Sequence, residues 1–160
     1  MDQEVIILMG SEKDLDFCRR ISETLKVLGL KYVFRVASAH KTPQKVLQIL
    51  EEYEGQKVVY ITVAGRSNAL TGFVDANTLS PVIACPPYSS KYGGADIYSS
   101  LRVPSGIGSV VTIEPGGAAL AAAKILALER PELRESIRDY QQKKKNEVKD
   151  ADRSLAKLKE

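Results

Sequence analysis

The single histidine of the chain, His40, lies within the run Val36–Pro43, where an apolar segment gives way to residues that start helices. Histidine is the side chain that most readily takes and gives a proton near neutrality. A lone histidine is usually a loop residue without a role, but Ser38 and Lys41 beside this one are suited to binding phosphate. We therefore interpret His40 as a candidate general acid–base group at the edge of an anion site.

A second polar loop, Gly10–Asp14, directly follows the apolar run Val5–Met9. The Ser11 hydroxyl and the backbone N–H groups of a starting helix would form a natural cradle for a phosphate group. Asp14 would repel a phosphate, and it fits better as a partner for a ribose hydroxyl. On these residues alone, an ordinary helix cap is an equally good interpretation.

A third polar loop, Ala64–Asn68, follows the apolar run Val58–Val63. Arg66, Ser67 and Asn68 supply hydrogen-bond donors that could hold a carboxylate, although a polar surface turn explains the same residues nearly as well. Since the carboxyl ends of parallel strands share one edge of a sheet, we expect the three loops to converge on one crevice.

Several other kinds of chemistry lack their sequence patterns. Neither GxGxxG nor GxxxxGK[ST] occurs, which argues against a nicotinamide enzyme or an ATPase. No nucleophile elbow, metal-ligand cluster or pair of acid–base carboxylates is apparent. Cys18 and Cys85 have no CxxC neighbour, which favours core thiols in a reduced, cytoplasmic protein without a zinc site.

The composition is that of one globular domain. The chain has 160 residues, of which 44% are hydrophobic and 27% charged, with a formal net charge of +3. This mildly basic balance suits a small anionic substrate and is too weak to indicate nucleic acid binding. The acidic start Met1–Glu4 and the short apolar run after it match neither a signal peptide nor a membrane span.

The elements that must position the loops alternate along the chain. Apolar runs predict strands over 5–9, 31–37, 58–63, 81–85 and 109–113. Helical periodicity and caps predict helices between them, with Ser11 and Thr42 as N-caps, Pro43 in a first turn and Gly29 at a helix end. This alternation predicts a parallel sheet in a three-layer α/β/α sandwich.

Two segments stand outside this pattern. Residues 89–108 have no clear periodicity, and long stretches of that kind are usually functional or pack on a partner. After Pro131 we predict a helix of about 28 residues with a narrow apolar stripe, which is typical of helix pairing. We therefore divide the chain into a catalytic part, 1–130, and a helix, 131–160, that contacts a neighbouring subunit; a solvated, fraying helix is the alternative. The stripe consists of Ile137, Tyr140, Lys144, Val148, Ala151, Leu155 and Leu158.

Five segments, in the right order between about Val5 and Leu128, together resemble phosphoribosylaminoimidazole carboxylase of de novo purine synthesis. They are Met9–Asp14, Ser38–Lys41, Ala64–Asn68, Pro81–Pro87 and Ser99–Gly106. The resemblance implies a flavodoxin-like fold, an octamer built around a four-fold axis with active sites at subunit junctions, and no metal, ATP or biotin. It implies a cofactor-independent enzyme acting on a small ribonucleotide, without a nucleic acid or membrane partner.

The family has two branches, and three departures favour one of them. Lys41 stands where the bacterial mutases have arginine, Arg66–Asn68 replaces a run of glycines and alanines, and Cys85–Pro87 replaces Gly-Val-Pro. Each departure is towards the animal-type enzyme, which carboxylates 5-aminoimidazole ribonucleotide directly with carbon dioxide. The alternatives are the mutase, which moves a carboxylate from the exocyclic nitrogen of the N5-carboxylated isomer to the ring carbon, and a non-catalytic phosphate- or nucleotide-sensing domain.

The resemblance also assigns roles. His40 would be the base that removes the proton from the ring carbon after carboxylation. Ribonucleotide binding falls to the loops after the first two strands, and the loop after the third would line the carbon dioxide or carboxylate site. The substrate-binding candidates are Gly10, Ser11, Asp14, Ser38, Ala39, Lys41, Gly65, Arg66, Ser67 and Asn68.

Overall fold

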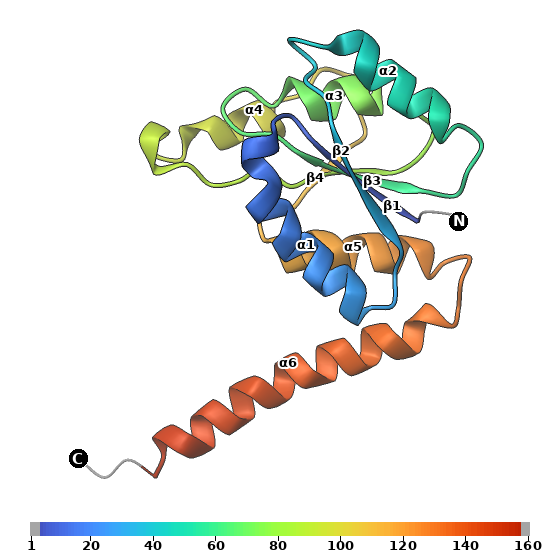
Figure 1. Ribbon diagram of the computed structural model, residues 1–160. Helices are drawn as coiled ribbons and strands as arrows, with labels where there is room; N and C mark the ends of the chain where they lie inside the picture. Colours follow the sequence, from blue (N-terminus) through green and yellow to red (C-terminus); the bar gives the residue numbers. More distant parts are fainter. Residues whose placement is uncertain (1–3, 158–160) are drawn as a thin grey trace.

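Five parallel strands form one sheet in the order β2-β1-β3-β4-β5 in the computed structural model, which describes residues 4–157 (Figure 1). The strands are β1 (Val5–Met9), β2 (Tyr32–Val36), β3 (Val59–Val63), β4 (Val82–Ala84) and β5 (Val110–Val111). The helices are α1 (Leu15–Val27), α2 (Pro43–Glu52), α3 (Ala69–Asp75), α4 (Tyr98–Leu101), α5 (Pro115–Leu126) and α6 (Leu133–Leu155). This strand order is the flavodoxin-like one and confirms the predicted fold class.

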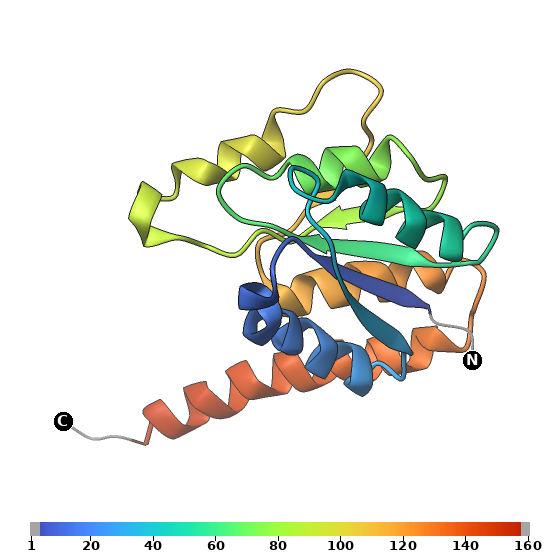
Figure 2. The ribbon, with the colours of Figure 1, turned by 45° about the horizontal axis from the view of Figure 1, so that its top comes forward.

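The central strand β1 is buried on both faces, and its alternate side chains enter two different cores. Val5, Ile7 and Met9 pack in the cluster that includes residues of α1 and α5, while Ile6 and Leu8 pack in the cluster with residues of α2 and α3. Figure 2 shows the two helical layers on opposite sides of the sheet. The continuous apolar run that predicted a strand buried on both faces is thereby explained.

The edge strand β5 is shorter than predicted. We expected a strand over 109–113, and only Val110 and Val111 form it, paired with Ile83 and Ala84 of β4. Because β4 itself has three residues, it offers β5 a short ladder. Val110 is 52% exposed, although it is apolar. The hydrophobicity of the run 109–113 therefore did not show how many of its residues pair with β4.

The helix boundaries follow the predicted signals with two corrections. Gly29 ends the α1 region with a φ of +75°, as expected for a helix-terminating glycine. The Ser11 side chain is an N-cap, but of the 3-10 turn η1 (Glu12–Asp14) that precedes α1 and not of α1 itself, and it accepts from the Lys13 N–H at 3.3 Å. Thr42 precedes α2 but makes no side-chain cap to that helix, because its hydroxyl is used elsewhere.

The C-terminal helix α6 packs on the body only through its first turns. Leu133 and Ile137 are buried against the core, whereas Val148 is 71% and Leu155 is 65% exposed. Figure 1 shows the second half of α6 extending away from the sheet and its covering helices. Leu158, the last member of the predicted stripe, lies outside the described residues.

The aperiodic segment 89–108 folds as short helical turns, η2 (Ser90–Tyr92), η3 (Ala95–Ile97) and α4. It runs beside α3 (Figure 2), and its end is fixed by a hydrogen bond of 2.7 Å from the Gly108 N–H to the Asp75 carboxylate. None of the helices within residues 4–157 combines the length and apolarity that crossing a membrane requires.

Candidate active site

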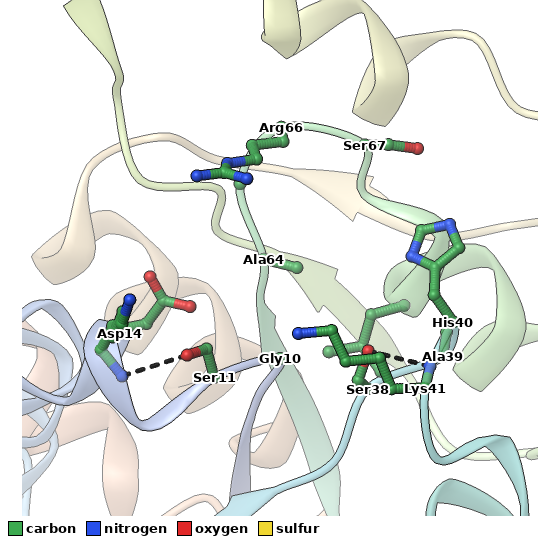
Figure 3. A pocket seen from close by; sticks show the side chains of 13 residues that line it. Gly10, Ser11, Asp14, Ser38, Ala39, His40, Lys41, Ala64, Arg66 and Ser67 are labelled. Carbon is green, nitrogen blue, oxygen red and sulfur yellow. Dashed lines mark hydrogen bonds between the residues drawn. The ribbon is translucent and has the colours of Figure 1, made fainter. Parts of the chain in front are cut away.

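The three predicted loops do converge on one cavity, of about 520 Å³, at the carboxyl ends of β1, β2 and β3 (Figure 3). In this strand order the connection leaves β1 towards β2 and then returns to β3 on the other side. Ligands of open α/β sheets bind at such a reversal. Every predicted site residue except Asn68 lines the cavity, and Lys13, Ala64 and Leu70 also line it.

The loop after β1 forms one wall of the cavity. The Gly10 N–H bonds to the Val63 carbonyl at 2.9 Å, and a Cβ at Gly10 would stand 3.5 Å from that of Ala64. The ends of β1 and β3 therefore approach closely here. Because the Ser11 hydroxyl oxygen only accepts from Lys13, its hydrogen is free to be donated to a ligand. Burial raises the pKa of Asp14 above its usual range, since desolvation disfavours the carboxylate.

The loop after β2 is closed by hydrogen bonds within the loop itself. The Thr42 hydroxyl oxygen accepts from the Ser38 N–H at 3.0 Å, and the Thr42 N–H donates to the Ser38 carbonyl at 2.8 Å. The Ser38 hydroxyl oxygen in turn accepts from the Lys41 N–H at 3.3 Å. His40 is held at the tip, exposed, with its imidazole directed towards the Ser67 side of the cavity (Figure 3).

The loop after β3 forms the opposite rim and carries an unusual backbone. Arg66 has a φ of +60°, the left-handed region that residues with a Cβ seldom adopt. Its guanidinium lies above Ala64 on the side of Asp14, and the Lys41 ammonium extends into the same space from below (Figure 3).

Asn68 does not line the cavity, which corrects its prediction as a cavity-lining residue. It is buried, its Oδ1 accepts from the Thr71 N–H at 3.2 Å as the N-cap of α3, and its Nδ2 donates to the Ser100 hydroxyl at 3.0 Å. Asparagine is among the preferred N-cap residues, so its place before an apolar run was a signal for this role.

The cavity has an excess of positive charge. Lys13, Lys41 and Arg66 contribute three cations against the one carboxylate of Asp14. Such a cleft attracts anionic ligands. The sequence does not single out Lys13 as a site residue, although it lies in the same polar loop as Ser11; its positive charge in a loop that follows a buried strand was the available signal.

The two cysteines are buried, as predicted for core thiols, and burial raises the pKa of each to about 12. Cys18 and Cys85 are therefore protonated near neutral pH and unsuited to nucleophilic chemistry. Within residues 4–157, no three His, Cys, Asp or Glu side chains gather closely enough to hold a metal ion.

Comparisons of the sequence and of the structure with known proteins both find relatives of the same kind. The sequence pattern of the AIR carboxylase family matches residues 4–147. A phosphoribosylaminoimidazole carboxylase of Archaeoglobus fulgidus is 54% identical, over 95% of this chain and 84% of its own length. The multifunctional protein ADE2 of Gallus gallus is 47% identical over 78% of this chain, which corresponds to 30% of its own length. The crystal structure of Treponema denticola PurE superposes with a TM-score of 0.91 at 46% identity, covering 96% of this chain and 98% of that one.

Proposed function

Since this chain belongs to the AIR carboxylase family of purine biosynthesis, we propose that it carboxylates 5-aminoimidazole ribonucleotide with carbon dioxide. The observation that carries this proposal is the meeting of one histidine, three cations and three serine hydroxyls in the cavity of about 520 Å³. The product is 4-carboxy-5-aminoimidazole ribonucleotide. For such a reaction the protein needs to bind the ribose phosphate of the ribonucleotide, exclude water from the ring and move one proton.

Phosphate binding falls to the two walls of the cavity nearest the strand ends. Ser11 and Ser38 offer hydroxyl donors, and Lys41 reaches between them with a charge that strengthens any hydrogen bond to phosphate. Asp14 accepts from a ribose hydroxyl. A hydrogen bond of that kind also suits a carboxylate that burial has left poorly solvated.

The chemical step then needs only one protein base. The ring carbon of the aminoimidazole is nucleophilic, like that of an enamine, and its electron pair forms the new bond to the carbon of carbon dioxide. One C=O bond pair moves onto oxygen, giving a carboxylate and a tetrahedral ring carbon. His40 takes the proton from that carbon, which restores the aromatic ring. Arg66, opposite, balances the new negative charge.

Three sequence features support the carboxylase over the mutase: Lys41, the loop Arg66–Asn68 and the run Cys85–Pro87. The distinction decides which ribonucleotide the protein accepts. We propose an assay that supplies aminoimidazole ribonucleotide with carbon dioxide, or the N5-carboxylated isomer alone, and follows formation of the 4-carboxylated product. If product forms from aminoimidazole ribonucleotide with carbon dioxide and not from the N5-carboxylated isomer, the result supports the carboxylase. Efficient conversion of the N5-carboxylated isomer would instead indicate the mutase. If neither substrate gave product, the result would favour the third alternative, a non-catalytic phosphate- or nucleotide-sensing domain.

We also propose that the protein acts in the cytoplasm as a homo-oligomer, and as an octamer in particular. The exposed apolar residues of α6 and of the β5 edge, Val148, Leu155, Val110 and Ile113, favour burial against other copies. Light scattering on the intact chain measures the assembly directly. Val148→Glu should weaken it, and Lys149→Glu on the neighbouring exposed face is the matched control. A stable, fully active monomer would contradict the proposal.

A further inference from the structure

Arg66 holds a backbone conformation that its own residue type disfavours. Among residues 4–157 it is the only non-glycine residue with a positive φ, +60°. The left-handed conformation brings Cβ close to the backbone, and such strain persists only where the surroundings fix it. The residues that hold the Arg66 backbone in this conformation therefore also determine where its guanidinium lies.

One hydroxyl, that of Ser99 in α4, bridges the two ends of the strained turn. Its oxygen accepts from the Asn68 N–H at 3.0 Å and lies 3.1 Å from the Arg66 carbonyl oxygen. It also lies 2.8 Å from the Asp96 carbonyl oxygen, so its hydrogen is shared between these two acceptors. Asp96 adds a longer bond of 3.4 Å from the Arg66 N–H to its own carboxylate.

Two further contacts hold the turn from its sides. The buried Asn68 amide donates to the Ser100 hydroxyl at 3.0 Å, which joins α3 to α4 directly. On the other side, a Cβ at Gly65 would stand 3.6 Å from the Pro87 ring. The Arg66 turn is thus clamped between the end of the β4 strand region and α4, neither of which lines the cavity.

We propose that Ser99 is a positioning residue for the reaction and acts through Arg66. By tying the Arg66 carbonyl to the Asn68 amide, its hydroxyl keeps the turn left-handed and the guanidinium over the cavity. This inference rests on the proposed function in one respect, namely that the charge of Arg66 meets the carboxylate being formed. Ser99 itself is not among the residues that line the cavity.

A double-mutant cycle tests the proposal. Ser99→Ala should lower kcat/KM about ten-fold, and Ser99→Thr, which keeps the hydroxyl, should recover most of that loss. In an Arg66→Ala background, Ser99→Ala should have less than a two-fold effect, because the side chain it positions is gone. The matched control is Ser90→Ala, since Ser90 is exposed on the same segment and its hydroxyl makes no hydrogen bond within the described residues.

A ten-fold loss in both backgrounds would overturn the proposal, because Ser99 would then act independently of Arg66. Wild-type kcat/KM in Ser99→Ala would overturn it as well.

Hydrogen exchange gives a second readout that does not depend on activity. In Ser99→Ala the amide of Asn68 loses its acceptor, so the peptide spanning 65–70 should exchange faster, while Ser90→Ala leaves it unchanged. Unchanged exchange in Ser99→Ala would overturn the clamp. A wild-type protein that makes no product would overturn the proposed function alone, and the exchange measurement would still decide whether Ser99 holds the turn.

Discussion

The loops after β2 and β3 face each other across the same cavity but are held in opposite ways. The loop from Ser38 to Thr42 is closed by bonds between residues three and four apart in sequence. The loop from Gly65 to Asn68 is held by Asp96, Ser99 and Ser100, which are 30 to 33 positions away. The side that carries the proposed base is therefore locally encoded, whereas the side that carries Arg66 depends on the rest of the fold.

The largest effect should follow from removing the base of the locally encoded loop. His40→Asn should lower turnover by about 10²–10⁴-fold, the usual contribution of a positioned acid–base group. Because the loop is closed by Ser38 and Thr42, ribonucleotide binding should stay within a few-fold of wild type. Steady-state kinetics and a binding titration separate the two quantities. Retention of more than a few per cent of the wild-type rate would show that another group moves the proton.

The next largest effect concerns the cation of that loop. Lys41→Met should raise the KM for the ribonucleotide by about 10- to 100-fold, through loss of a charge-assisted contact to phosphate. Lys41→Arg should also be impaired, since a planar fork need not fit a site built for a compact ammonium. Initial-rate measurements over a range of substrate concentrations provide the check. An unchanged KM in Lys41→Met would place this side chain outside the phosphate site.

A smaller effect sharpens the contrast between the loops. Thr42→Val removes the acceptor of the Ser38 N–H and should lower kcat/KM about three- to ten-fold. Since the two loops share no hydrogen bond among those described, combining Thr42→Val with Ser99→Ala should multiply the separate losses. Kinetics of the two single variants and the double variant form the measurement. A combined loss well below the product would mean that the two rims are coupled.

The smallest effect is a change in stability at Asp14. Burial raises its folded-state pKa, so the folded protein binds this proton more tightly than the unfolded chain does. The carboxylate therefore destabilises the fold increasingly as pH rises from its usual pKa of 3.8 through the raised value, and fully above that. Asp14→Asn should slightly raise the free energy of unfolding at pH 7.5, and the gain should shrink towards pH 4. Denaturant titrations at both pH values test this; a gain that grows on acidification would contradict it.

The same contrast explains how much the sequence could predict. The run Val5–Met9, the α1 periodicity and Gly29 are local signals, and the strands, helices and convergence of the loops followed from them. The bounds of β5 depend on the length of β4, its partner, so hydrophobicity alone overestimated them.

The site shows the same limit. The sequence predicts Thr42 as an N-cap, but its hydroxyl oxygen accepts from the Ser38 N–H instead. A threonine hydroxyl can cap a helix or close a loop in this way, so the residue type alone does not distinguish the two roles. Asn68 looked like a ligand donor and is a buried N-cap tied to Ser100. The sequence placed no role on Ser99, because nothing near it reveals that α4 lies against the Arg66 turn. Contacts between distant segments were the part that local patterns could not show.

The sheet order also sets when each core is completed as the chain lengthens. The face of β1 that carries Ile6 and Leu8 finds nearly all its partners by Val82, in α2, α3 and the adjoining strands. The opposite face, with Val5, Ile7 and Met9, is left without α5 until residue 126 has been made. A nascent chain of about 80 residues therefore has one completed apolar face and one that only α1 covers, and the apolar surface left exposed there is prone to aggregation. By completing the second core, α5 thus protects the earlier strands and helices from aggregation.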